Sequence, residues 1–179
     1  MNNVMLDLET FGTLPGSVIR SVGAVMFDPH GEGTGAEFYM NVDDASCGAA
    51  GLTKDAGTIR WWADVSRRRA NEQLLKDTHD IKDACESFRT WFRKNGGVFL
   101  WSQGSNFDEV LMGCAMRSVK VVQPWKFSDA RDTRTAYDIS GFNSYGVKRA
   151  GTYHNALDDA KHQVLCVQRS YAKVKGRMV

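Results

Sequence analysis

Two acidic residues interrupt the first apolar stretch of the chain. Val4-Met5-Leu6 has the character of a buried strand, yet Asp7 and Glu9 follow it two positions apart. Because side chains i and i+2 of a strand point to the same face, these two carboxylates should lie side by side. Like charges held together away from water raise the pKa of one of the pair unless a cation lies between them. Any fold for this chain must therefore supply positive charge at the end of its first strand.

Hydrophobic patterning beyond this pair predicts strands first and helices later. Apolar stretches over 17–28 and 36–42 flank a turn that contains Pro and Gly, so the chain should begin with a three-stranded antiparallel meander. Residues 43–57 are expected to be a loop. Further predicted elements are a short helix over 58–64, an amphipathic helix from Ile81 to Phe92, a strand over 98–101, a helix near 106–117, a strand within 119–129, a helix that begins in 131–139 and a long final helix after 154. This order predicts an α/β fold with a mixed five-stranded sheet, flanked by helices, whose chemistry sits at the carboxyl ends of strands.

The composition is that of an ordinary globular protein, with 42% hydrophobic and 25% charged residues, and without repeats or linkers we expect residues 1–179 to form a single domain. No apolar run approaches the ~18–20 residues of a membrane span and no signal peptide precedes the first strand, so no membrane partner is expected. The four cysteines lack a C-x-x-C pair and fit reduced thiols, which predicts a cytoplasmic location. The net charge of +2 neither requires nor excludes nucleic acid.

Further ionisable residues are expected at the same edge of the sheet. Asp108 falls in the first turn of a predicted helix. Asn155 is a good N-cap for the final helix, which leaves His154 in the preceding loop and puts Asp158 and Asp159 in the first turn. Each residue has an ordinary alternative, since acids near a helix N-terminus stabilise the helix by ~0.3–1 kcal/mol and a histidine before a helix is commonly a surface group. Spacing alone does not choose between the two adjacent aspartates, which lie on opposite flanks of the apolar stripe.

Together with the pair in the first strand, these carboxylates predict a metal centre. Four carboxylates at one edge need cations, and hard oxygen ligands select Mg²⁺ or Mn²⁺ rather than zinc. Two such ions ~3.5–4 Å apart would clamp the attacking and leaving oxygens of a phosphodiester. A histidine beside them would take the proton from the attacking water. The residues themselves therefore predict two-metal phosphodiester hydrolysis.

Three short motifs resemble those of one enzyme family. They are "DLET" (7–10), "SNFD" (105–108) and "HNALDDA" (154–160), which resemble the D-x-E-T, N-x-D and H-x-A-x-x-D motifs of the DEDDh, or DnaQ-like, 3'–5' exonucleases of the ribonuclease H-like superfamily. The resemblance covers nearly the whole chain, from residue 4 to about residue 167. It implies a ribonuclease H-like fold, and it selects Asp159 rather than Asp158 as the ligand of the last motif.

The resemblance also implies a role for each matching residue. The metal ligands would be the four carboxylates of the motifs, Asp7, Glu9, Asp108 and Asp159. They would bind two Mg²⁺ or Mn²⁺ ions, with His154 as the general base. Glu9 would also face the terminal 3'-hydroxyl, and Phe11 would wedge near the last base, with Thr10 and Asn106 as further substrate contacts. Such enzymes release nucleoside 5'-monophosphates from a 3' end.

Other stretches are similar to one branch of this family. "TIRWW" (58–62), "WSQGSNFD" (101–108) and "RDTR" (131–134) are similar to the ribonuclease AS branch, and to proteins called exodeoxyribonuclease VIII-like. The branch implies a small RNase for single-stranded RNA, usually a homodimer. Trp61 and Trp62 would stack on bases at ~1–3 kcal/mol each, and Arg131 and Arg134 would hold a phosphate. The alternatives are that at least one tryptophan belongs to the core and that the arginines pair with neighbouring aspartates.

The favoured hypothesis is a metal-dependent 3'–5' exonuclease that acts on the 3' end of single-stranded nucleic acid, with RNA favoured over DNA. A DNA-specific proofreading or repair exonuclease is the alternative enzyme, and a non-catalytic nucleic-acid binding module is the third possibility. The complete set of acids argues against the third, because binding alone does not need four converging carboxylates.

Overall fold

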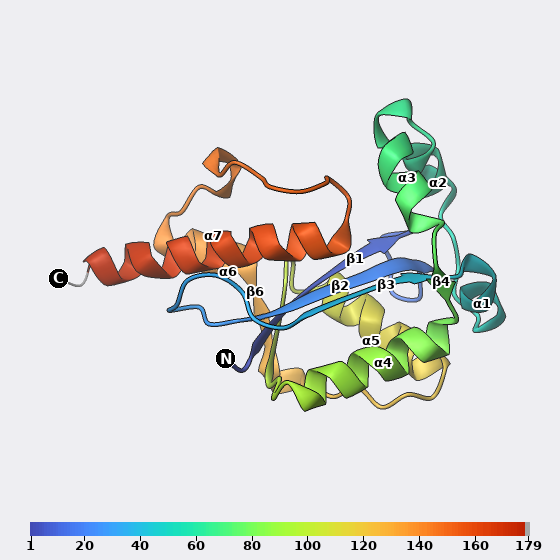
Figure 1. Ribbon diagram of the computed structural model, residues 1–179, viewed down its shortest axis with the longest axis horizontal. Helices are drawn as coiled ribbons and strands as arrows, with labels where there is room; N and C mark the ends of the chain where they lie inside the picture. Colours follow the sequence, from blue (N-terminus) through green and yellow to red (C-terminus); the bar gives the residue numbers. More distant parts are fainter. Residues whose placement is uncertain (178–179) are drawn as a thin grey trace.

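The computed structural model describes residues 1–177, which form one mixed sheet with helices on both faces (Figure 1). The strands are β1 (Asn3–Thr10), β2 (Ile19–Phe27), β3 (Glu37–Val42), β4 (Thr78–His79), β5 (Phe99–Ser102) and β6 (Ala130–Asp132). The helices are α1 (Asp44–Ala49), α2 (Ala56–Trp62), α3 (Arg68–Leu74), α4 (Ile81–Lys94), α5 (Asp108–Ser118), α6 (Thr133–Ser140) and α7 (Ala156–Arg177). The strand order is β4-β3-β2-β1-β5-β6, in which β1 and β3 run antiparallel to β2 and the remaining pairs are parallel. The predicted meander and mixed sheet are confirmed.

Side-chain alternation along β1 separates two apolar cores. Leu6 and Leu8 belong to the core against α4 and α5, whereas Met5 belongs to the core against α6 and α7. Figure 1 shows these two helix pairs on opposite faces of the sheet. Asp7 and Glu9 continue the face of Met5, since they follow it at a spacing of two. The acidic pair therefore points to the side of the sheet that α7 covers.

The start of α7 lies directly against β2 at Gly23. This glycine is paired with Asp7 across the sheet, and a Cβ at its position would overlap the backbone of Ala156 and Leu157. Only glycine permits so close an approach of helix to strand. The contact brings the first turn of α7, and the loop before it, to the acidic end of β1.

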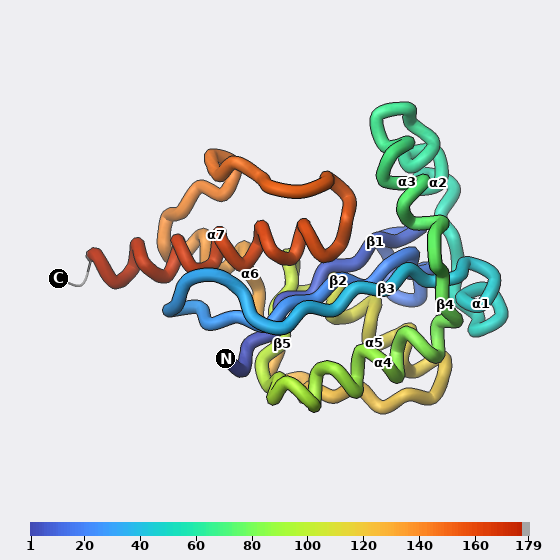
Figure 2. Tube along the Cα trace, in the orientation of Figure 1, coloured from blue at the N-terminus to red at the C-terminus, as the bar shows by residue number. Residues whose placement is uncertain are grey.

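Two segments connect to this end of the sheet. Figure 2 shows residues 44–75, which carry α1 to α3, gathered beyond the carboxyl end of β1, and residues 141–155 returning along α7. Within α1–α7 as the structure describes them, no helix has both the length and the apolar character needed to cross a membrane.

The sheet differs from the prediction at both edges, with six strands across residues 1–177 instead of five. Edge strand β4 has two residues, too few for a periodic signal, and pairs with β3 in parallel. The fifth predicted strand is displaced, because residues 119–129 form no strand and β6 begins at Ala130. Val121 and Trp125 are buried in the core of α4 and α5 from irregular backbone. Their apolar character was the source of the wrong strand prediction.

The segment 43–57, expected to be a loop, contains α1 and the start of α2. Both helices begin at an aspartate whose side chain accepts a hydrogen bond from the backbone N–H three residues later, Asp43 from Ser46 and Asp55 from Thr58. The two aspartates are residue types typical of helix N-caps, but the short helices that follow them have little apolar periodicity, so the sequence pattern did not predict helical structure within 43–57.

Candidate active site

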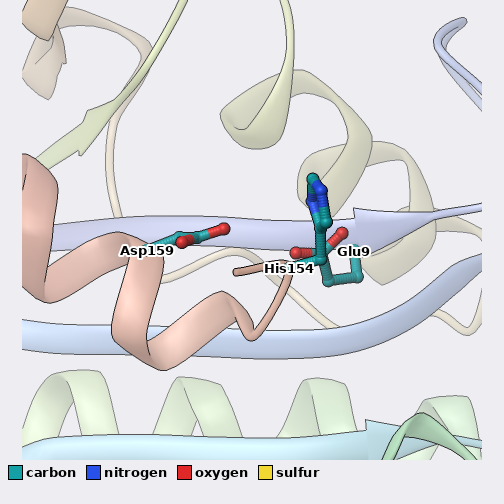
Figure 3. A group of neighbouring side chains, drawn as sticks. All are labelled: Glu9, His154 and Asp159. Atoms are coloured by element: carbon teal, nitrogen blue, oxygen red, sulfur yellow. The ribbon is translucent and has the colours of Figure 1, made fainter. Parts of the chain in front are cut away.

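Three side chains from different parts of the chain meet at the end of β1. Figure 3 shows Glu9 on β1, His154 in the loop before α7 and Asp159 on the first turn of that helix. A ligand atom from each lies within 4.8 Å of the other two. Glu9 and Asp159 are only 7% and 9% exposed, and His154 has a left-handed backbone with φ of 61°. The group has the spacing and the donor types of a metal site.

The local structure at the start of α7 distinguishes the two adjacent aspartates. The side chain of Asn155 accepts hydrogen bonds from backbone N–H groups of the first turn at 3.1 and 3.2 Å, as its position at the N-cap predicted. Asp158 Oδ2 accepts a hydrogen bond from the backbone N–H of Thr152 at 2.7 Å. Asp158 therefore holds the preceding loop, while Asp159 lies with Glu9 and His154.

Asp7 and Asp108 lie beside this group. Asp108 Oδ1 accepts a hydrogen bond from the backbone N–H of Leu8 at 3.0 Å, and the charge of Asp108 acts on both Asp7 and Glu9. Asp108 is 2% exposed. Asp7 Oδ1 accepts a hydrogen bond from Nε2 of Gln163 at 2.7 Å. The structure thus gathers all four predicted carboxylates, although only Glu9 and Asp159 share the compact group with the histidine.

Burial raises the pKa values of three of these carboxyl groups, and neighbouring negative charges add to the rise for Glu9 and Asp7. Burial, reinforced by the charge of Asp108, raises the pKa of Glu9 to about 8. Burial also raises the pKa of Asp108 to about 7. For Asp7, burial and the charges of Asp108 and Glu9 raise the pKa well above its usual value. A divalent cation would favour the charged form of every one of them.

Arg20 on β2 supplies part of the positive charge that the acidic pair requires. It is 4% exposed, and its charge opposes the rise in the pKa of Glu9. Its guanidinium lies over the rings of Phe11 and Trp62, at 4.1 and 4.5 Å from their centroids. A further bond of 2.6 Å runs from Arg20 Nη1 to Asn71 Oδ1. The apolar pattern of residues 17–28 does not single out this arginine.

Arg149 and Gln163 also lie at the site, although neither was expected there from the sequence. Arg149, in the connection before α7, forms an ion pair with Asp159. Gln163 holds Asp7, as described above, and lies four residues after Asp159 on the same face of α7. The spacing of four residues from Asp159 could have indicated Gln163 as a neighbour of the site. Arg149 lies in an irregular segment, where no periodicity relates it to the motifs.

A cavity of about 530 Å³ opens beside Glu9. The residues that line it are Leu8, Glu9, Thr10, Thr13, Asp55, Gly57, Thr58, Trp61, Trp62 and Phe107. Trp61 is 41% exposed and meets His154 edge to face, with 4.9 Å between ring centroids. Trp62 is buried and donates a hydrogen bond from Nε1 to the carbonyl of Thr10 at 2.8 Å. Trp62 is therefore held in the interior of the protein, whereas the ring of Trp61 is accessible from the cavity.

Phe11 and Asn106, which were predicted to contact substrate, do not line this cavity. Phe11 is packed between cations, with the Arg20 guanidinium and the Lys54 ammonium at 4.1 and 4.8 Å from its ring centroid. Phe107 lines the cavity instead. Asn106 is exposed and is not part of the cavity wall.

The arginines of the "RDTR" stretch differ in their surroundings. Arg131 donates hydrogen bonds to the carbonyls of Ser128 and Ala130 at 2.9 and 2.8 Å, and its guanidinium lies 4.4 Å from the ring centroid of Phe99. These contacts give Arg131 a structural role. Arg134 is exposed, lines a separate cavity, and its charge opposes the rise in the pKa of Asp108.

Solved structures with the same fold include three nucleases. The nuclease domain of 3'hExo, a DEDDh family member bound to rAMP, has a TM-score of 0.63 and 13% identity, over 93% of this chain and 90% of that one. The 3'-exonuclease that recognises the histone mRNA stem-loop has a TM-score of 0.61 and 13% identity, over 93% and 80%. E. coli exonuclease I in complex with a 5cy-dA13 oligonucleotide has a TM-score of 0.61 and 12% identity, over 96% and 40%. The predicted ribonuclease H-like fold is thereby confirmed.

Comparison by sequence is more specific than comparison by fold. No match was found among the curated proteins. Residues 2–171, however, match a family model over almost the whole chain, and the DEDDh assignment made from three motifs agrees with it. The chain belongs to the family of the 3'-5' exoribonuclease Rv2179c-like domain.

Proposed function

We propose that this 3'–5' exonuclease acts on single-stranded RNA in preference to DNA and releases nucleoside 5'-monophosphates. The observation that carries the proposal is the convergence of Glu9, His154 and Asp159 within 4.8 Å, next to Asp7 and Asp108. Membership of an exoribonuclease family supports RNA as the substrate. The intact set of ionisable groups supports catalysis rather than binding alone.

The donor set fits two divalent ions, Mg²⁺ or Mn²⁺. The residues that would hold them are Asp7, Glu9, Asp108 and Asp159, all of which offer hard carboxylate oxygens. Three of these groups have raised pKa values, which indicates that Arg20 and Arg149 do not balance their charge. When bound, the ions activate water and neutralise charge that develops on the phosphate.

His154 is suited to accept the proton of the attacking water. Its pKa is lowered by burial and by the nearby charges of Arg67 and Arg149. The imidazole is therefore neutral near pH 7, which is the form that a general base requires. The edge-to-face contact with Trp61 orients the ring beside Glu9.

The cavity beside Glu9 is the proposed position of the terminal nucleotide. Its apolar walls, above all Trp61 and Phe107, would hold the base, while Glu9 and Thr10 would face the ribose. The scissile phosphate of a nucleotide placed there would lie at the carboxylates. This arrangement accounts for Trp61 as a substrate residue, and Phe107 takes the place that the motif comparison suggested for Phe11.

The experiment is a digestion of matched RNA and DNA single strands with 5' labels. We expect progressive shortening from the 3' end, faster for RNA, and only when Mg²⁺ or Mn²⁺ is added. An Asp7→Ala variant should bind the oligomer without cutting it. Digestion by that variant at the parental rate would refute the metal assignment. Faster digestion of DNA would favour the alternative of a DNA-specific exonuclease. The structural similarity to exonuclease I in complex with a 5cy-dA13 oligonucleotide is the observation that supports testing this alternative.

The domain organisation, the oligomeric state and the cellular location of the protein are further proposals. We propose that residues 1–179 act as a single domain, which limited proteolysis would test. The homodimer implied by the branch resemblance would be tested by sedimentation equilibrium. A cytoplasmic location agrees with the free state of Cys47, Cys85, Cys114 and Cys166, and fractionation of cells would test it.

A further inference from the structure

A second cavity lies next to the carboxylates and shares no lining residue with the cavity at Trp61. Its volume is about 320 Å³, and it is lined by Asp7 and Asp159 together with Arg149 and Tyr153 from the connection before α7. The two cavities thus meet the acidic residues from different sides, one at Glu9 and the other at Asp7 and Asp159. A site for one terminal nucleotide needs only the first of them.

The second cavity continues into a third. The third has a volume of about 410 Å³ and is lined by Arg134 and by residues of the segment 141–145. Both cavities have Gln103, Ser144 and Tyr145 in their walls. We call these two joined cavities the upstream track. The track leads from the carboxylates to α6, and the segment 141–145 that helps to line it belongs to the connection that Figure 1 shows running along α7.

The walls of the upstream track combine exposed aromatic rings with arginines. Tyr145 is 99% exposed and Tyr153 is 61% exposed, so neither ring is used in the apolar core. The guanidinium of Arg149 lies 4.6 Å from the ring centroid of Tyr153, and Arg134 is exposed at the far end. Exposed rings that alternate with positive charges are the composition of surfaces that bind single strands without reading their sequence.

We propose that the upstream track binds the nucleotides on the 5' side of the scissile phosphate, with a base stacked on Tyr145 and a phosphate held by Arg134. This proposal rests on the proposed function. If the terminal nucleotide occupies the cavity at Trp61, its phosphate lies at the carboxylates, and we place the rest of the strand on the side of Asp7 and Asp159. The upstream track is the hollow surface that begins there.

The test compares a substrate that has upstream nucleotides with one that has none, and follows how each variant changes the ratio of their rates. The p-nitrophenyl ester of uridine 5'-monophosphate carries a terminal nucleotide alone, whereas an RNA of about seven nucleotides also fills the track. In Tyr145→Ala, the ratio of kcat/KM for the RNA to kcat/KM for the ester should fall about tenfold, mainly through KM, as a base-stacking contact is lost. Tyr145→Phe should restore the ratio. Arg134→Ala should lower it and reduce the salt dependence of RNA binding by about one phosphate contact.

Matched variants separate this proposal from general effects. Phe127, which is 91% exposed and lines none of the three cavities, serves as the control, and Phe127→Ala should leave the ratio unchanged. Trp61→Ala should slow both substrates. If Tyr145→Ala leaves the ratio at its parental value, the track is refuted. If the parent protein cleaves neither substrate with Mg²⁺ or Mn²⁺, the proposed function fails. The upstream track is then tested separately by the affinity for labelled RNA, measured by fluorescence anisotropy in Asp7→Ala with and without Tyr145→Ala. An equal affinity of the two proteins would refute the track.

Discussion

Asp7 and Glu9 share one face of β1, the carboxyl group of Asp108 accepts a hydrogen bond from the backbone N–H of Leu8, and Asp159 approaches Glu9 from α7. Arg20 and Arg149 offset part of this negative charge, and burial raises the pKa of Glu9 to about 8. Two apolar side chains would fill the same space without the electrostatic cost of burying like charges. The carboxylates are therefore better explained by what they bind than by what they stabilise.

Asp158 and Asp159 provide a matched pair for the ligand assignment. Asp159→Asn removes an oxygen charge from the centre, so hydrolysis of RNA should fall by more than about a hundredfold, because metal-ion catalysis supplies several kcal/mol. Asp158→Asn loses only the bond to the N–H of Thr152, so the protein should keep Mn²⁺ binding and melt at a slightly lower temperature. Calorimetric titration with Mn²⁺ and a rate assay measure both effects. Equal losses in the two variants would contradict the distinction between them.

At the scale of elements, what brings the site together is the close packing of α7 on β2. Local patterns predicted the helices α4, α5 and α7 and the meander, because each has apolar periodicity or a defined cap. They also predicted Asp108 and His154 at element ends, and the family motifs selected Asp159. They did not predict Arg149, whose place beside Asp159 depends on the path of an irregular connection. They misplaced β6, whose three residues lack any alternating apolar pattern.

Gly23→Ala tests this packing. The added methyl group would overlap the backbone of Ala156 and Leu157, so α7 must shift at its first turn. We expect a loss of stability of ~1–3 kcal/mol, as for other overpacked sites, and a weaker affinity for Mn²⁺ because Asp159 moves with the helix. Urea unfolding and calorimetric titration measure the two effects. Gly48→Ala is the control, since a Cβ at Gly48 in α1 meets nothing within 4 Å.

At the scale of the whole molecule, the proposed metal centre lies at the carboxyl end of β1, where several segments of the chain meet. α2 contributes Trp61, the loop before α5 contributes Phe107, and the connection before α7 contributes Arg149 and His154. Each reaches the end of β1 from a different direction. Stability of the fold and occupancy of the centre should therefore be coupled through the charge on its carboxyl groups.

This coupling predicts how stability changes with pH when metal is removed. Glu9 has a pKa of about 8 in the folded chain, against an ordinary value of 4.5, and Asp108 has about 7 against 3.8. The folded state thus binds more protons than the unfolded state between these values. The stabilisation that this provides is complete below about pH 4, is lost progressively as pH rises toward about 7 for Asp108 and about 8 for Glu9, at ~1.4 kcal/mol per pH unit for each proton retained, and does not change further above those values. His154 has the opposite effect, because its pKa is lowered from 6.5, and it acts below that pH.

In EDTA, the melting temperature should therefore fall as pH increases from about 6.5 to about 8 and level off above about 8, and saturating Mn²⁺ should remove most of the fall. The measurement is thermal unfolding followed by circular dichroism, with and without metal. Glu9→Gln is the control, since it deletes the group with a pKa of about 8 and should flatten the profile in EDTA while it weakens the response to Mn²⁺. A melting temperature in EDTA that is constant or rises over this range would mean that the carboxyl groups are already compensated by Arg20 and Arg149, and the centre would then have no electrostatic need for a divalent ion.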